Sequence, residues 1–153
     1  MRDVITEENE KQITEAIGLA EANTSGEIRV HIENFCPHDP LDRAVEVFAA
    51  LHMHKTKLRN GVLFYVALKS HKFAVIGDAG INAVVPDNFW DEIKTNVLAS
   101  FKNRDFADGL VKGILMAGEQ LRTYFPHDDV NDINELGNEI SFGKTEEPGP
   151  GPQ

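Results

Sequence analysis

The stretch GVLFYVAL, residues 61–68, decides the fold, because almost every position in it is apolar. A strand that is apolar on both of its alternating faces is typical of the centre of a sheet covered on both sides. The polar residues SHK (70–72) follow, and then a second apolar run at 73–77. So short a connection predicts an antiparallel hairpin of strands 61–68 and 73–77, with strand 61–68 in the middle of the sheet.

Residues 27–34 form the strand that is expected on the other side of strand 61–68. Ile28, Val30 and Ile32 point one way, and the polar side chains between them point the other way, which predicts a half-buried strand with His31 on the surface. A helix that begins at the pair Asp39-Pro40 joins the two strands. They are therefore expected to be parallel, with a right-handed crossover.

Four helices are expected around this sheet. The first follows Thr6, the second starts at Pro40, the third begins near Asp87 and the fourth near Asp105. Apolar residues at helical spacing mark their buried faces. The fold class is therefore α/β, an α/β/α-type sandwich with a small mixed sheet of parallel strands plus an antiparallel hairpin.

The length and the net charge of the chain limit the number of domains and the kinds of ligand that can be expected. The chain has 153 residues and a formal net charge of −10. This suits one domain, expected over residues 1–126, followed by an acidic irregular extension at 127–143 and a disordered tail at 144–153. The negative charge favours cations as ligands and argues against nucleic acid and anionic membrane surfaces.

Cellular context follows from the cysteine count and the hydropathy. The single cysteine, Cys36, excludes an intrachain disulfide. No apolar run approaches the roughly 18 residues of a membrane helix. A cytoplasmic monomer without membrane insertion is therefore expected.

Three segments are expected to meet at one edge of the sheet. Residues 25–30 open the first strand, residues 59–63 open the second, and residues 77–82 close the third, which runs back. This topology brings Glu27, the pair Arg59-Asn60 and Asp78 to the same rim. Carboxylate and amide oxygens there predict a metal or phosphate site.

Two further aspartates, Asp87 and Asp105, are candidates for the same rim, but each also stands where a helix cap belongs. Ligation and capping both stay open for them. The pair His52-x-His54 is a weaker candidate. At this spacing on a helix the two rings point about 200° apart, so they could share a metal only if the helix has ended before them.

Four segments, 26–30 (GEIRV), 59–63 (RNGVL), 77–81 (GDAGI) and 106–110 (FADGL), together resemble the TPM domain family. The resemblance spans about residues 5–125 and is strongest to stand-alone bacterial domains, including those of marine Bacteroidetes. It implies a compact α/β sandwich that binds divalent cations, and acid phosphatase activity has been attributed to plant members. The family's asparagine before the central strand matches Asn60, and its aspartates match Asp87 and Asp105.

This chain has DAGIN at 78–82 where many members of the family have a Gly-Tyr-Gly-Leu-Glu segment. Its tyrosine and acidic positions therefore differ here, and no catalytic residue can be carried over.

Three hypotheses follow for the function. The first is a divalent-cation module, with Ca²⁺ ahead of Mg²⁺, whose ligands are the side chains of Asp78, Asp87, Asp105 and Asn60. The second is a weak metal-dependent acid phosphatase at the same rim, with Arg59 and Glu27 near the phosphate or behind the ligands. The third is a chaperone-like interaction domain, possessing a protein partner and no active site.

Overall fold

The computed structural model describes residues 5–127 and 136–143, so the expectations for residues 128–135 and 144–153 lie outside it. The elements follow one another in this order: α1 (Glu7–Glu21), β1 (Glu27–Glu33), α2 (Pro40–Ala50), the 3₁₀ turn η1 (Met53–Lys55), β2 (Gly61–Ala67), β3 (Lys72–Gly77), α3 (Ala79–Asn82), α4 (Asp91–Lys102), α5 (Phe106–Leu121) and β4 (Ser141–Phe142).

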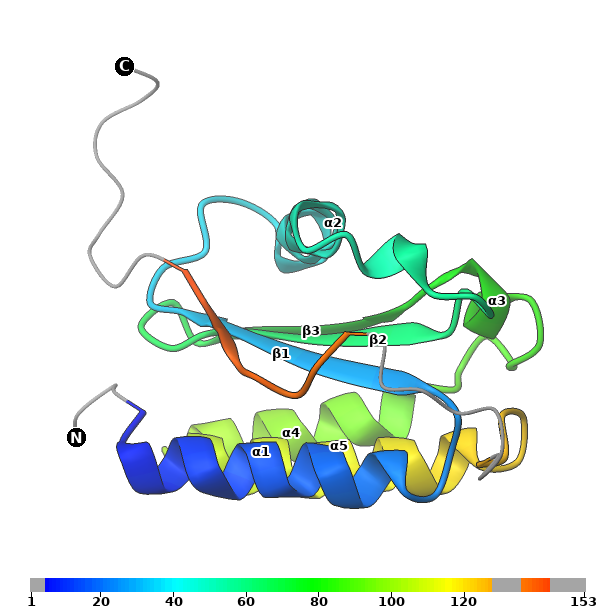
Figure 1. Cartoon of the computed structure of the whole chain (residues 1–153). Coiled ribbons are helices and arrows are strands. Elements are labelled where there is room, and N and C mark those ends of the chain that lie inside the picture. Colours follow the sequence, from blue (N-terminus) through cyan, green and yellow to red (C-terminus); the bar gives the residue numbers. More distant parts are fainter. Residues whose placement is uncertain (1–4, 128–135, 144–153) are drawn as a thin grey trace.

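One mixed sheet of order β3-β2-β1-β4 lies at the centre of the molecule. β1 and β2 are parallel, with Glu27 opposite Gly61, and β2 and β3 are antiparallel. Every residue of β2 is buried. Helix α2 covers one face of the sheet, and α1, α4 and α5 cover the other (Figure 1). The predicted α/β sandwich, its mixed sheet and its central strand are therefore confirmed.

Helices α1 and α5 approach each other closely where small residues meet. A Cβ atom on Gly118 would lie 2.8 Å from the Cα and Cβ atoms of Ala20, closer than real Cβ contacts come. Glycine at 118 therefore sets the distance between these helices. Among the described residues, no helix is long and apolar enough to cross a membrane.

Two helices differ in detail from the sequence-based expectation. The third long helix begins at Asp91 rather than near Asp87, because the chain first forms the short α3 and then a turn at Pro86. Helix α2 was expected to bury Leu41, Ala44, Val45, Phe48 and Leu51, but Leu41 is 48% exposed and Val45 is 58% exposed. Its buried residues are Ala44, as expected, and Val47.

The polar side of β1 was expected to face solvent, and this was wrong. Glu27, His31 and Glu33 are each less than a tenth exposed. Residues 136–143 cross this side of β1 (Figure 1) and end in β4, which pairs with β1 in parallel through His31 and Ser141. The described end of the extension therefore adds a strand to the sheet, where an irregular segment was expected.

Candidate functional site

Hydrogen bonds join the three rim segments at the edge where β1 and β2 begin and β3 ends. The backbone N–H of Glu27 donates to the carbonyl of Asn60 at 3.2 Å, and the N–H of Asp78 donates to the carbonyl of Gly61 at 2.9 Å. The N–H of Gly80 donates to the carbonyl of Arg59 at 2.8 Å. The three rim segments therefore lie side by side, as expected.

Arg59 and Asp78 form a two-point ion pair at this rim. Nε and Nη2 of Arg59 donate to Oδ2 and Oδ1 of Asp78 at 2.7 and 2.8 Å. The Asp78 side chain is 6% exposed, whereas half of the Arg59 side chain is exposed. A guanidinium has five N–H donors, of which this pair uses two, so three remain on its outer edges.

Electrostatics keep the Asp78 carboxyl ionised. Burial alone would raise its pKa, but hydrogen bonds from Arg59 and from the N–H of Ala79, with the charge of His54 nearby, outweigh burial and lower the pKa. The same ion pair raises the pKa of Arg59. The rim therefore carries a fixed, oriented pair of opposite charges.

Asn60 and Glu27 lie beside this pair and hold the rim together. The side-chain amide of Asn60, which is 2% exposed, donates to the carbonyl of Ser25 at 3.1 Å. Oε1 of Glu27 accepts the N–H of Leu136 at 3.0 Å. Both side chains thus bind backbone groups of neighbouring segments.

The structure does not bring Asp105 to these residues. Asp105 lies at the opposite end of the sheet, because the adjoining Phe106 packs on His71 in the β2–β3 turn, with ring centroids 6.1 Å apart. It occupies the N-cap position of α5, yet its side chain makes no capping hydrogen bond. Asp87 sits in an exposed turn ahead of α4.

Among the residues that the structure describes, carboxylates therefore do not gather into a cage at the rim. Among the described residues, no three His, Cys, Asp or Glu side chains lie close enough to hold a metal ion. The residues that the rim does bring together are Glu27, Arg59, Asn60 and Asp78.

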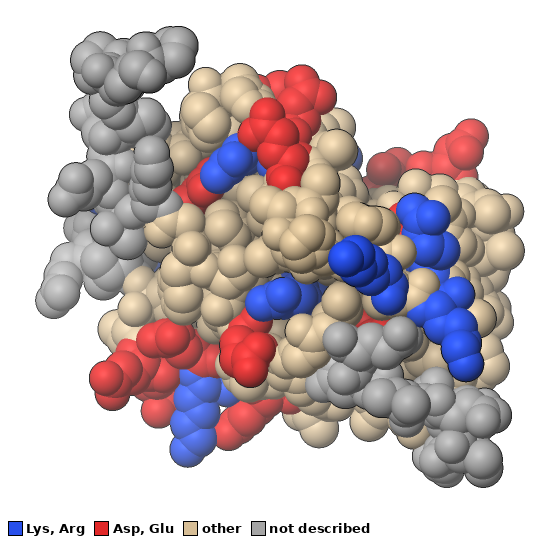
Figure 2. Space-filling model, turned by 45° about the horizontal axis from the view of Figure 1, so that its top comes forward, with Lys and Arg blue, Asp and Glu red and all other residues tan. Residues whose placement is uncertain are grey.

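Positive charge gathers next to the Arg59–Asp78 pair. Residues 52–59, with the sequence HMHKTKLR, contain five basic or protonatable side chains and no acidic one. All five are exposed: His52, His54, Lys55, Lys57 and Arg59. Figure 2 shows several Lys and Arg side chains close together on the right, the side on which η1 and α3 lie in Figure 1.

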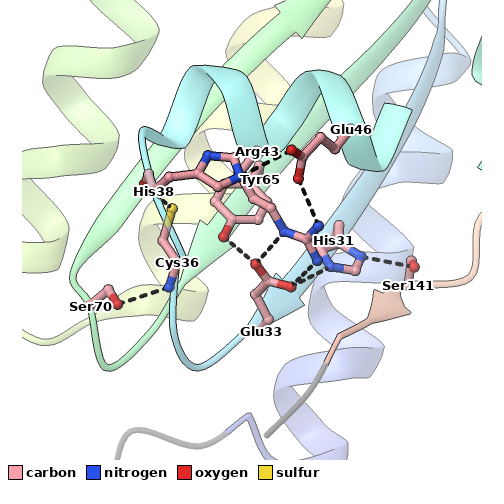
Figure 3. A network of polar contacts seen from close by, with 9 residues as sticks. All are labelled: His31, Glu33, Cys36, His38, Arg43, Glu46, Tyr65, Ser70 and Ser141. Carbon is pink, nitrogen blue, oxygen red and sulfur yellow. Dashed lines mark hydrogen bonds and ion pairs between the residues drawn. The ribbon is translucent and has the colours of Figure 1, made fainter. Parts of the chain in front are cut away.

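A second polar cluster, which the sequence did not predict, lies at the other end of β1 (Figure 3). Glu33 is at its centre. Nε and Nη2 of Arg43 in α2 each donate to one Glu33 oxygen at 2.9 Å, and the Tyr65 hydroxyl of β2 also donates to Glu33. His31 bonds Glu33 at 3.2 Å and Ser141 at 2.9 Å. Two features of the sequence could have indicated this cluster: the polar side chains that alternate along β1, and a tyrosine within the otherwise apolar strand β2.

This cluster shifts the pKa values of its members. Burial would raise the pKa of Glu33, but the hydrogen bonds from His31, Arg43 and Tyr65 outweigh burial and lower it to about 2. Burial, followed by the bond to Glu33, raises the pKa of Tyr65. Both Glu33 oxygens are thus occupied by donors from three elements, an arrangement that ties α2 to the sheet.

The chain is similar in sequence and structure to a protein of known structure. The BA42 protein of the psychrophilic bacterium Bizionia argentinensis has a similar NMR structure, with 51% sequence identity, a TM-score of 0.85, and coverage of 91% of this chain and 95% of that one. Among curated proteins there was no match.

Two more distant structures share the fold. An N-terminal domain from P. gingivalis has 17% identity and a TM-score of 0.64, covering 80% of this chain and 81% of its own. The N-terminal domain of cg2496 from Corynebacterium glutamicum has 14% identity and a TM-score of 0.58, covering 94% and 81%. The family model of the TPM domain matches residues 1–120. The chain therefore belongs to the TPM domain family.

Proposed function

We propose that this TPM domain binds a phosphate-bearing ligand at the rim, with the phosphoryl group on the outer edge of the Arg59 guanidinium. The observation that carries the proposal is the Arg59–Asp78 pair, in which a nearly buried carboxylate orients a half-exposed guanidinium. Arginine matches the geometry of phosphate oxygens through paired N–H donors, and three donors of Arg59 remain beyond the pair.

The surroundings of Arg59 favour an anion over a bare cation. His54 and Lys55 are exposed nearby, and the closest carboxylate, that of Asp78, is already bonded to Arg59. A fixed guanidinium also loses little conformational freedom when a ligand arrives, which favours binding.

An NMR titration tests the proposal. Inorganic phosphate should shift the amide resonances of residues 58–61 and 77–80 in the wild-type protein, and Arg59→Gln should abolish these shifts. Arg104→Gln removes an exposed arginine at the other end of the molecule and serves as the matched control. Shifts that persist in Arg59→Gln, or that vanish equally in Arg104→Gln, would contradict the proposal.

A divalent cation is the second candidate, and the ionised Asp78 carboxylate is the observation that favours it. Mg²⁺ is commonly bound by one or two carboxylates together with substrate phosphates and water, so it does not need a full protein cage. The cation would then enter with the phosphate. It could polarise a phosphoryl oxygen, as the phosphatase hypothesis requires.

The two candidates separate in titrations with Mg²⁺ or Ca²⁺ alone, phosphate alone, and Mg²⁺ plus phosphate, with p-nitrophenyl phosphate hydrolysis as a further readout. If the rim binds a divalent cation, Asp78→Asn should weaken cation binding about tenfold or more, which is about 1.4 kcal/mol. Asp105→Asn is the matched control and should leave it unchanged. Calcium binding that depends on Asp105 but not on Asp78 would place the cation elsewhere.

A further inference from the structure

The segment 52–59 stands out because its charge opposes that of the whole chain. The protein has a formal net charge of −10, yet this segment holds three Lys or Arg residues, two histidines and no acidic residue. All five of these side chains are exposed, while Met53 and Thr56 between them are buried.

The backbone of this segment is held in place at several points. Met53 is fully buried, the N–H of Lys55 donates to the carbonyl of His52 at 3.1 Å, and the N–H of Arg59 donates to the carbonyl of Thr56 at 3.2 Å. A Cβ atom on Gly80 would lie 2.2 Å from the carbonyl oxygen of Leu58, so this glycine lets α3 pack directly on the segment. The basic side chains therefore extend from an ordered backbone.

The histidine pair raises the question of whether the segment attracts a metal or an anion. Helix α2 ends before it, His52 has a φ of 56°, and the rings of His52 and His54 come within 6.3 Å, centroid to centroid. Two neighbouring imidazole rings can act as ligands of a metal ion. However, Lys55, Lys57 and Arg59 belong to the same exposed segment, and the Asp78 carboxylate is held by Arg59, so the local charge disfavours a cation and favours an anion.

The acidic remainder of the molecule limits the size of that anion. Charges are screened over about 8 Å at physiological ionic strength, so the segment acts on what touches it. A nucleic-acid duplex or an anionic bilayer would extend beyond the segment onto the rest of the chain, which carries an excess of negative charge. A short chain of phosphate groups would not.

Resting on the proposed function, we infer that segment 52–59 makes the rim selective for a linear chain of two or more phosphate groups over a single phosphate. The terminal phosphate lies on Arg59, and the next groups meet Lys55 and Lys57, two exposed lysines of the same segment. Free oligophosphates and the phosphate chain of a nucleoside triphosphate share this chemistry.

Isothermal titration with phosphate, pyrophosphate and tripolyphosphate tests the inference. Tripolyphosphate should bind the wild-type protein about tenfold or more tightly than phosphate, since each exposed charge pair adds up to about fivefold. The double variant Lys55→Gln/Lys57→Gln should lose most of this preference but keep its phosphate affinity within about threefold, and Lys55→Gln alone should lose part of it. ATP in place of tripolyphosphate shows whether a nucleoside adds affinity.

The control variant Lys102→Gln/Arg104→Gln removes the same charge from exposed positions at the end of α4. It should preserve the preference for tripolyphosphate. Equal affinities for phosphate and tripolyphosphate, an equal loss in the control, or tighter binding of a DNA oligonucleotide or acidic peptide would overturn the inference and leave the proposed function standing. Binding of none of the three phosphate compounds would overturn both.

Discussion

Arg59 and Asp78 stand 19 positions apart in the chain, and both polar atoms of the Asp78 carboxylate receive hydrogen bonds from the same guanidinium. The hairpin of β2 and β3 brings them together, because Arg59 lies just ahead of β2 and Asp78 just after β3. The pair links the two segments and presents the outer edge of Arg59 to solvent.

Asp78→Asn should lower the free energy of unfolding by about 1 kcal/mol. It removes a charged partner of Arg59, and the exposure of Arg59 limits what the ion pair contributes. Asp105→Asn should change stability by less than about 0.5 kcal/mol, because the Asp105 side chain makes no capping bond. Urea denaturation of both variants checks this. A larger loss for Asp105→Asn would mean that Asp105 is the structural carboxylate.

The core of the sheet depends on Phe64. It is fully buried in β2, and its ring lies 6.0 Å from that of Phe73. Phe64→Ala should cost about 3–5 kcal/mol, whereas Leu98→Ala, at a position that is 39% exposed, should cost far less. Chemical denaturation gives both values, and an unchanged midpoint for Phe64→Ala would refute the central position of β2.

Glu33 should stabilise the protein more at neutral pH than in acid. The pKa of Glu33 is about 2 in the folded protein against an ordinary value of 4.5, so its contribution is complete above about pH 4.5 and is lost as the pH falls toward 2. The wild-type protein should exceed Glu33→Gln in stability at pH 7 by about 2–3 kcal/mol.

This difference should shrink at pH 3. Glu46→Gln, which removes a half-exposed partner of the same arginine, provides the control and should show little pH dependence. A Glu33 effect that stays constant between pH 3 and pH 7 would speak against the lowered pKa.

Ionisation of Glu21 should have the opposite effect on stability, lowering it as the pH rises. Burial raises its pKa to about 7, although its Oε2 accepts the N–H of Ile28. The folded protein therefore binds this proton more tightly than the unfolded chain, and stability falls as the pH rises from about 4.5 to 7. Glu21→Gln keeps an acceptor for Ile28 and should be more stable than the wild type at pH 8, by on the order of 1–3 kcal/mol.

Thermal unfolding at pH 5 and pH 8 measures this gain, with the exposed Glu15→Gln on the same helix as the control. A gain for Glu21→Gln that is already complete at pH 5 would be inconsistent with a raised pKa.

The sequence predicted those parts of the fold that depend on local pattern. The apolar run in β2 and the short turn after it determine the hairpin, and the hairpin determines that Asn60 and Asp78 meet. The position of Asp105, in contrast, was not predicted correctly. Helix α4 has 12 residues and carries the chain about 18 Å from the rim, so a cap position beyond it lies near the opposite end of the sheet.

The polar side of β1 could not be interpreted from its own alternation. Whether Glu27, His31 and Glu33 face solvent depends on a segment more than 100 positions later, and alternation carries no information about such a distant cover. The cluster around Glu33 likewise needs Arg43 from α2 and Tyr65 from β2 at once. Contacts of this kind follow from packing, which a pattern within one strand does not determine.

Titration calorimetry of Arg59→Lys with inorganic phosphate tests whether the Arg59 guanidinium holds the phosphate. Lysine keeps the positive charge but lacks the planar fork that bonds Asp78 on one edge and leaves donors on the other. We predict that phosphate affinity falls about fivefold or more in Arg59→Lys, while Lys102→Gln at the end of α4 leaves it unchanged. Equal phosphate affinity in the wild type and Arg59→Lys would contradict it.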